Sequence, residues 1–156
     1  MRAFAEVFRP TRSHQMTDFT ALLGVDFRRR APATRAEIAR LEKTLGVLLP
    51  LNYKDFLAWS DGGEGEVGDL YLSMWAVEQV IELNALYSIT TRMGRGFVGI
   101  GTDGGDYCFA LDLRRDQRFV VVPLGALAED EVKSLASDLV AGLTAIHDGH
   151  ITGNDL

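Results

Sequence analysis

The fold of this chain is decided by residues 41–72, which read LEKTLGVLLPLNYKDFLAWSDGGEGEVGDLYL. Gly46 suits the left-handed position that ends a helix. Pro50 suits the start of the next helix, because the first turn needs no amide donor there. Asp61-Gly62-Gly63 then ends the second helix. From Leu70 to Met74 apolar residues occupy every second position, as in a strand with one buried face. The stretch therefore predicts two helices and a strand.

A capping box marks the start of the helix that Gly46 ends. In Thr34-Arg35-Ala36-Glu37 the threonine hydroxyl can accept from the third helical amide, while the glutamate reaches back to the threonine amide. Ile38, Leu41 and Leu45 then fall on one face at helical spacing. We expect a helix over residues 34–45.

Beyond residue 74 the apolar pattern changes its period. Val77, Val80 and Ile81 have helical spacing, which predicts a helix through about Tyr87. Three β runs follow, Phe97–Gly101, Tyr107–Leu113 and Arg118–Val122. The order helix, helix, strand, helix, three strands, helix predicts a single α+β domain with a largely antiparallel, twisted sheet flanked by helices.

The C-terminal segment has two interpretations. Apolar residues between Val132 and Ile146 fit one continuous helix that begins at about Glu129. Ser137 is equally suited to be the N-cap of a shorter helix.

The length of 156 residues and the hydrophobic content of 47% fit one globular domain. We assign this domain to residues 34–150, followed by a C-terminal tail over residues 151–156. Residues 1–33 read as an N-terminal extension, in which Met16–Leu23 can form a short helix.

A nucleotide-binding motif has to be considered at residues 99–105, GIGTDGG, which match the string G-x-G-x-x-G. A dinucleotide loop works because a helix begins inside it and directs amide donors at the pyrophosphate. Here the following residues are rich in β formers, and Asp103 and Asp106 would repel a phosphate. We interpret the loop as a hairpin between two strands.

Charge is unevenly distributed along the chain, whose net charge is −6. Residues 1–30 hold six arginines and three acidic residues, whereas residues 31–156 hold ten basic and 19 acidic residues. This acidic body argues against binding of nucleic acid, because affinity for phosphate backbones comes from cationic side chains. We interpret Arg28-Arg29-Arg30 as a solvated linker rather than a phosphate contact.

We expect a cytoplasmic protein that does not contact the membrane. No apolar run approaches the roughly 20 residues that span a bilayer, and the N-terminus lacks the apolar core of a signal peptide. Cys108 is the only cysteine, so one chain cannot form a disulfide framework. Its apolar β run predicts a buried, inert thiol.

Residues for catalysis or metal binding do not form a recognisable set. His147 and His150 have the spacing H-x-x-H, but a closed zinc site needs four donors and no others lie nearby in the sequence. A nucleophilic Cys–His pair needs an exposed thiolate, which the setting of Cys108 disfavours. We therefore expect no catalytic residue, no metal and no cofactor, and hence a protein that is not an enzyme.

Five carboxylates gather in two predicted loops, Glu64, Glu66 and Asp69 in the first and Asp103 and Asp106 in the second. They do not follow the ligand order of a calcium loop. They are either solvated turn residues or an acidic surface that selects a cationic partner. Trp59 and Trp75 are likewise either packing residues or anchors of such an interface.

Four stretches in order resemble the SUKH superfamily (Smi/Knr type) over roughly residues 34–148. They are residues 41–72 quoted above, WAVEQVIELNALYSITT at 75–91, FVGIGTDGGDYCFALDLR at 97–114 and AEDEVKSLASDLVAGL at 128–143. The sequence departs from the family pattern at Asp61, where asparagine is usual, at Asp106, where a third glycine is common, and at Leu139, where Phe is frequent. The resemblance favours Ser137 as the last N-cap.

What this resemblance implies is an α+β domain not known as an enzyme. In bacteria such a domain is often an immunity protein that binds and neutralises a secreted toxin domain, and in fungi a regulator of cell-wall synthesis. We therefore expect a protein partner, with a toxin domain of basic surface as the first candidate. The alternatives are a regulatory or scaffolding domain that binds a host protein and a small-molecule-binding domain with a deep pocket.

Overall fold

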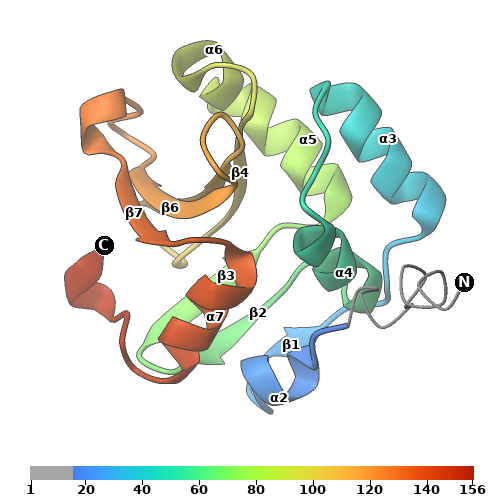
Figure 1. The fold of residues 1–156 in the computed structure, drawn as a ribbon, viewed down its shortest axis with the longest axis vertical. Helices are drawn as coiled ribbons and strands as arrows, with labels where there is room; N and C mark the ends of the chain where they lie inside the picture. The colour runs from blue at the N-terminus through green and yellow to red at the C-terminus, as the bar shows by residue number, and fades with distance from the viewer. Residues whose placement is uncertain (1–15) are drawn as a thin grey trace, which may run out of the picture.

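The computed structural model describes residues 16–156, and the first half of the N-terminal extension lies outside the described residues. The described residues form one antiparallel sheet in which the strands follow chain order, β1-β2-β3-β4-β5-β6-β7 (Figure 1). The strands are β1 (Arg28–Arg29), β2 (Gly63–Val67), β3 (Leu70–Met74), β4 (Phe97–Thr102), β5 (Tyr107–Asp112), β6 (Arg118–Pro123) and β7 (Lys133–Ala136). The helices are α2 (Phe19–Leu23), α3 (Arg35–Leu45), α4 (Leu51–Trp59), α5 (Val77–Leu86), α6 (Ile89–Met93) and α7 (Leu139–His147), with short 3-10 helices η2 (Glu129–Glu131) and η3 (Gly153–Asp155). The α+β prediction is confirmed.

Local signals set the helix ends as predicted. The Thr34 hydroxyl accepts from the Glu37 amide at 3.1 Å, and the Glu37 carboxylate accepts from the Thr34 amide at 2.8 Å, which confirms the capping box at the start of α3. Gly46 ends this helix with a φ of 69°. Pro50 is the N-cap of α4.

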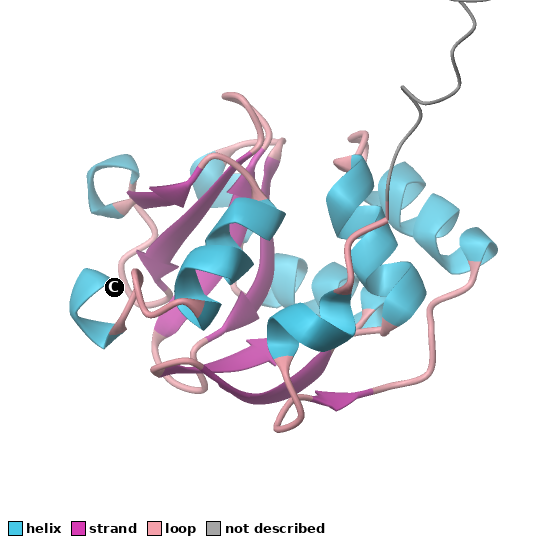
Figure 2. Ribbon diagram, turned by 60° about the horizontal axis from the view of Figure 1, so that its bottom comes forward, coloured by secondary structure: helices cyan, strands magenta, loops and turns pink. Residues whose placement is uncertain are grey.

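Different helices cover the two sides of the sheet. The strand register shows which side chains face each side. Gly99, Ala110 and Val120 are aligned across β4, β5 and β6 on the side where α5 and α6 pack. Leu111 and Phe119 point to the other side, which holds α7 with α2 and α4 beside it. Figure 2 shows the sheet curving around α7. The β2–β3 hairpin extends beyond α5 and α6.

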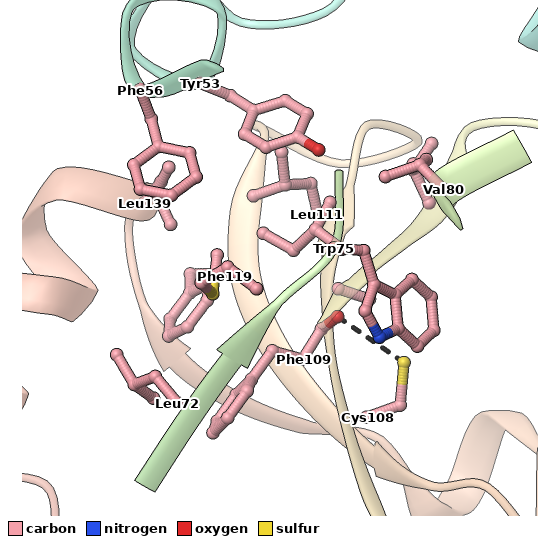
Figure 3. Packing of buried hydrophobic residues seen from close by; sticks show 14 of the residues in the cluster. Tyr53, Phe56, Leu72, Trp75, Val80, Cys108, Phe109, Leu111, Phe119 and Leu139 are labelled. Carbon is pink, nitrogen blue, oxygen red and sulfur yellow. Dashed lines mark hydrogen bonds between the residues drawn. The ribbon is translucent and has the colours of Figure 1, made fainter. Parts of the chain in front are cut away.

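Aromatic residues dominate the core on the α7 side. The rings of Phe109 and Phe119 stack with centroids 5.5 Å apart, below Tyr53 and Phe56 of α4 and close to Leu139 of α7 (Figure 3). All five side chains are buried. Large, rigid apolar side chains of this kind contribute most of the free energy of folding per residue.

Asn84, buried in α5, connects that helix to an irregular point in β4. Its side-chain amide donates to the carbonyls of Val80 at 2.7 Å and Gly99 at 2.9 Å, and the Gly99 amide donates back to its Oδ1 at 2.9 Å. The register between β4 and β5 shifts just after Gly99. Asn84 thus satisfies the polar backbone groups that the irregular pairing would leave without partners.

A second buried polar group, Asp112, closes the β5–β6 hairpin. Arg114 donates from Nε and Nη2 to its two carboxylate oxygens at 2.8 and 3.0 Å, and from Nη1 to the Met93 carbonyl at 2.7 Å and to Glu129 at 2.9 Å. Burial alone would raise the pKa of Asp112, but the bonds and charge of Arg114 outweigh it and hold that pKa below the usual value. The arginine therefore joins α6, the hairpin and η2.

The C-terminal segment differs from both sequence interpretations. A continuous helix from Glu129 is wrong, because η2 and strand β7 occupy residues 129–136 and β7 pairs with the edge of β6. Ser137 as N-cap is wrong by one residue, since the Asp138 carboxylate accepts from the Ala141 amide at 2.8 Å. Strand pairing therefore overrode the helical spacing.

The described part of the N-terminal extension and the C-terminal tail pack onto the domain. Phe19, Leu23 and Phe27 join the hydrophobic core, as do Ile151 and Leu156. The predicted short helix is confirmed as α2, with Asp18 as its N-cap. The linker interpretation of Arg28–Arg30 is wrong, because Arg28 and Arg29 pair with β2 as an edge strand.

Candidate partner-binding surface

The outer side of the β2–β3 hairpin carries the first group of predicted acids. Glu64 and Glu66 lie in strand β2 and not in the predicted loop. Their side chains face outward, whereas Gly63, Gly65 and Val67 alternate with them and face inward. Register places Glu64 beside Ser73 and Glu66 beside Tyr71. We call the outer side chains Glu64, Glu66, Tyr71 and Ser73 the β2–β3 face.

Tyr71 of β3 lies at the centre of this face and connects a cation of β1 with a carboxylate of β2. Its hydroxyl donates to Glu64 Oε1 at 2.6 Å and accepts from Arg28 Nη2 at 3.0 Å. The bond to the Glu64 carboxylate raises the pKa of Tyr71, so the hydroxyl stays protonated and orients both charges. This role of Tyr71 was not predicted from the sequence, although the strand alternation already placed the side chain outward.

The glycine loop, which holds the second group of acids, packs on the same tyrosine. Strands β4 and β5 pair on either side of the loop, which confirms the hairpin interpretation of GIGTDGG. Gly104 has a φ of +85° and lies against the Tyr71 ring so closely that a Cβ there would be 2.9 Å from Cδ2. Asp103 stabilises the turn, because its Oδ1 accepts from the amides of Gly105 at 2.9 Å and Tyr107 at 3.2 Å.

The remaining predicted acids lie close to this arrangement. Asp106 is exposed in the glycine loop. Asp69 is exposed at the β2–β3 turn, where its Oδ2 accepts from the Gly153 amide at 3.3 Å and so contacts the C-terminal tail. Because Thr102 pairs with Ser73, the loop after β4 runs along β3 toward the turn that holds Asp69.

The two tryptophans are placed differently. Trp75 is only 4% exposed and belongs to the core, close to Gly99. Trp59 is half-buried at the end of α4, where its ring stacks on Phe27 and carries the Arg29 guanidinium 4.4 Å from its centroid. Only Trp59 is accessible from the surface, beside β1.

Residues 16–156 show no reactive thiol and no metal-binding cluster. Cys108 is fully buried, and burial raises its pKa to about 12, so that it is a protonated thiol at neutral pH. His147 and His150 are exposed, and residues 16–156 contain no cluster of three or more His, Cys, Asp or Glu side chains arranged to hold a metal ion. None of the helices described is long and apolar enough to cross a membrane.

The arrangement is suited to recognition through charge. Glu64 of one hairpin bonds the Tyr71 hydroxyl, Gly104 of the other packs on its ring, and both hairpins carry exposed carboxylates. Charges placed at such a surface accelerate association with an oppositely charged partner and disfavour wrong partners.

Comparison with known proteins gives the family. No curated protein matches the chain. The model of the SMI1 / KNR4 family (SUKH-1) matches residues 32–144, which include every strand from β2 to β7 and the helices α3 to α6. Since the match covers most of the sequence and the fold is the expected α+β arrangement, the chain belongs to the SMI1 / KNR4 family (SUKH-1).

Proposed function

We propose that this protein is a non-enzymatic binding module of the immunity type, which acts in the cytoplasm by binding and neutralising a toxin domain. Its contact surface is the β2–β3 face together with the acids of the glycine loop. Family membership supports a protein partner, and the acidic body supports a partner with a basic surface. No nucleic acid takes part.

The observation that carries this proposal is the convergence of two hairpins on Tyr71. Glu64 and Gly104 are 40 residues apart in the chain, yet one bonds the tyrosine hydroxyl and the other packs on its ring. Glu66 and Asp106 are exposed, and their carboxylates form no hydrogen bond or ion pair with the described residues. As far as residues 16–156 are concerned, these two carboxylates can therefore meet cations of a partner.

The test takes candidate toxin domains encoded by genes adjacent to that of this protein, and measures binding by calorimetry at several salt concentrations and protection of cells that express the toxin. The double variant Glu66→Lys with Asp106→Lys reverses two charges without removing an internal bond. The matched control is Glu82→Lys with Asp130→Lys, two exposed acids on α5 and η2.

We expect the first pair to weaken binding at least about tenfold, which corresponds to about 1.4 kcal/mol, and the control pair to change it little. Affinity should also fall with rising salt. Absence of a complex, absence of protection, or equal weakening by both pairs would contradict the proposal.

A second candidate function is a regulatory or scaffolding domain that binds a host protein. It is favoured by exposed apolar side chains at the end of α5, where Leu86 is 72% exposed and lies with Tyr87 beside the loop Leu124–Ala128. Replacing Leu86 and Tyr87 by Ser distinguishes the two functions. Loss of partner binding in this variant, with binding intact after charge reversal at Glu66 and Asp106, would favour the scaffold.

A further inference from the structure

A basic groove overlaps the β2–β3 face on the side where α5 begins. Arg28, Arg29 and Arg30 line a depression of about 240 Å³, together with Glu64, Ser73 and Gln79. All three arginines are exposed, and Glu64 belongs to both the groove and the acidic surface. Acidic residues outnumber basic ones almost two to one over residues 31–156. Three adjacent arginines therefore give this groove a charge opposite to that of its surroundings.

Packing holds the arginines in place. The Arg28 guanidinium donates to the Tyr71 hydroxyl at 3.0 Å. Arg29 stacks on the Trp59 ring and donates to the Trp59 carbonyl. The backbone amide of Arg30 donates to Ser60 Oγ at 2.8 Å, which anchors the chain while the side chain lines the groove.

Ordered guanidinium groups lose little conformational entropy when they bind a ligand. A guanidinium group has five N–H donors in a planar fork that matches the two oxygens of a carboxylate. One N–H of Arg28 is used internally, so most of its donors face the groove or solvent, whereas the Arg29 guanidinium lies over Trp59 on the other side of β1. Glu64 does not fill the groove, because its carboxylate is bound to Tyr71.

From these contacts we infer that the groove receives an acidic side chain of the same protein partner whose basic surface meets Glu66 and Asp106, an inference that rests on the proposed function. The partner therefore carries a carboxylate next to its cations, and the two surfaces match in both signs. A carboxylate fits better than a phosphate, because a dianion would meet stronger repulsion from Glu64 and the acidic body.

The experiment is a titration of the full chain with the peptide acetyl-Glu-Asp-Glu-amide, followed by NMR of arginine Nε–H, glutamine side-chain and Trp59 indole resonances. The peptide acetyl-Gln-Asn-Gln-amide and inorganic phosphate are titrated in parallel. Arg30→Gln removes a groove cation and leaves the backbone bond to Ser60 intact, while Arg92→Gln is the matched change on exposed α6.

We expect saturable shifts at Arg28, Arg30 and Gln79 with the acidic peptide, and an affinity that falls at least threefold in Arg30→Gln but not in Arg92→Gln. Shifts that do not saturate, equal shifts with the neutral peptide, equal weakening by both variants, or tighter binding of phosphate would overturn the inference.

The titration does not need the toxin, so the two proposals can fail separately. A missing toxin complex would refute the proposed function even if the peptide binds the groove. If the toxin complex forms and Arg30→Gln binds the toxin with unchanged affinity, the groove inference fails and the proposed function stands.

Discussion

Replacing Gly104 by Ala is the most direct perturbation of the contact between the two acidic hairpins. Gly104 has a φ of +85° and a neighbouring ring where its Cβ would be, whereas Gly105 has its nearest atom, Asp103 Oδ1, at an ordinary 3.5 Å. Gly104→Ala and Gly105→Ala therefore make the same chemical change at adjacent positions with different surroundings.

The structure allows the size of the difference to be worked out. A left-handed conformation costs an alanine about 1–2 kcal/mol, a cost that only Gly104→Ala carries. The added Cβ of that variant lies 2.9 Å from Tyr71 Cδ2, well inside the optimal separation of about 3.5–4.0 Å, so the ring has to shift. Both variants gain about 0.4–1 kcal/mol from a less flexible unfolded chain. We expect Gly104→Ala to be less stable than Gly105→Ala by about 2 kcal/mol.

Urea denaturation followed by tryptophan fluorescence measures this difference, and thermal unfolding should show a gap of about 4–8 °C. A double-mutant cycle with Tyr71→Ala separates the two causes, because removing the ring abolishes the contact but not the strain at φ +85°. Equal stabilities of the two glycine variants would refute the reasoning. A cost of Gly104→Ala that is unchanged without the Tyr71 ring would refute the part that concerns the contact.

Three further predictions concern the framework that supports this surface. Asn84→Ala leaves the buried amide and carbonyl of Gly99 without their side-chain partners, so the free energy of unfolding in urea should fall by about 2–4 kcal/mol. A loss no larger than that of an ordinary surface substitution would contradict this prediction. Asp112→Asn weakens the pairing with Arg114 and should cost about 2 kcal/mol at neutral pH. Because the pKa of Asp112 is lowered in the folded state, its contribution to the free energy of unfolding is present above the unfolded pKa and is lost as pH falls through the folded pKa. The difference in stability between wild type and Asp112→Asn should therefore disappear in acid. A difference that stays constant across the pH series would contradict this prediction. Gln117→Gly should raise stability by about 0.5–1 kcal/mol, since Gln117 has a φ of 60° in the β5–β6 turn, and a lower melting temperature would count against this.

Elements with strong local signals were predictable from the sequence. The capping box of α3 and the β runs at β4, β5 and β6 appear where their patterns place them. The short strands β1 and β7 were not predictable, because their extended conformation comes from pairing with β2 and β6. Strand β2 was not predicted, because two of its three inward positions are glycines and the sequence therefore resembles a loop.

The candidate surface was predictable only in part. Composition singled out the carboxylates, and these do lie on or beside the β2–β3 face. Composition cannot show that Arg28 lies beside Tyr71, 43 positions away, because this neighbourhood depends on the pairing of β1 and of β3 with the strand β2 between them. Trp75 illustrates the same limit, since its burial depends on packing against β4.

Strand register is therefore what brings these charged side chains onto one face of the sheet. The turn between Val67 and Leu70 fixes the pairing, and the inward positions Leu70, Leu72 and Met74 are buried. A slip of one residue would turn every side chain of β3 to the other side of the sheet. It would expose those three apolar side chains, at a cost of about 1.5–3 kcal/mol each, and would bury the Tyr71 hydroxyl away from Glu64. The hydrophobic core therefore determines where the charged groups lie.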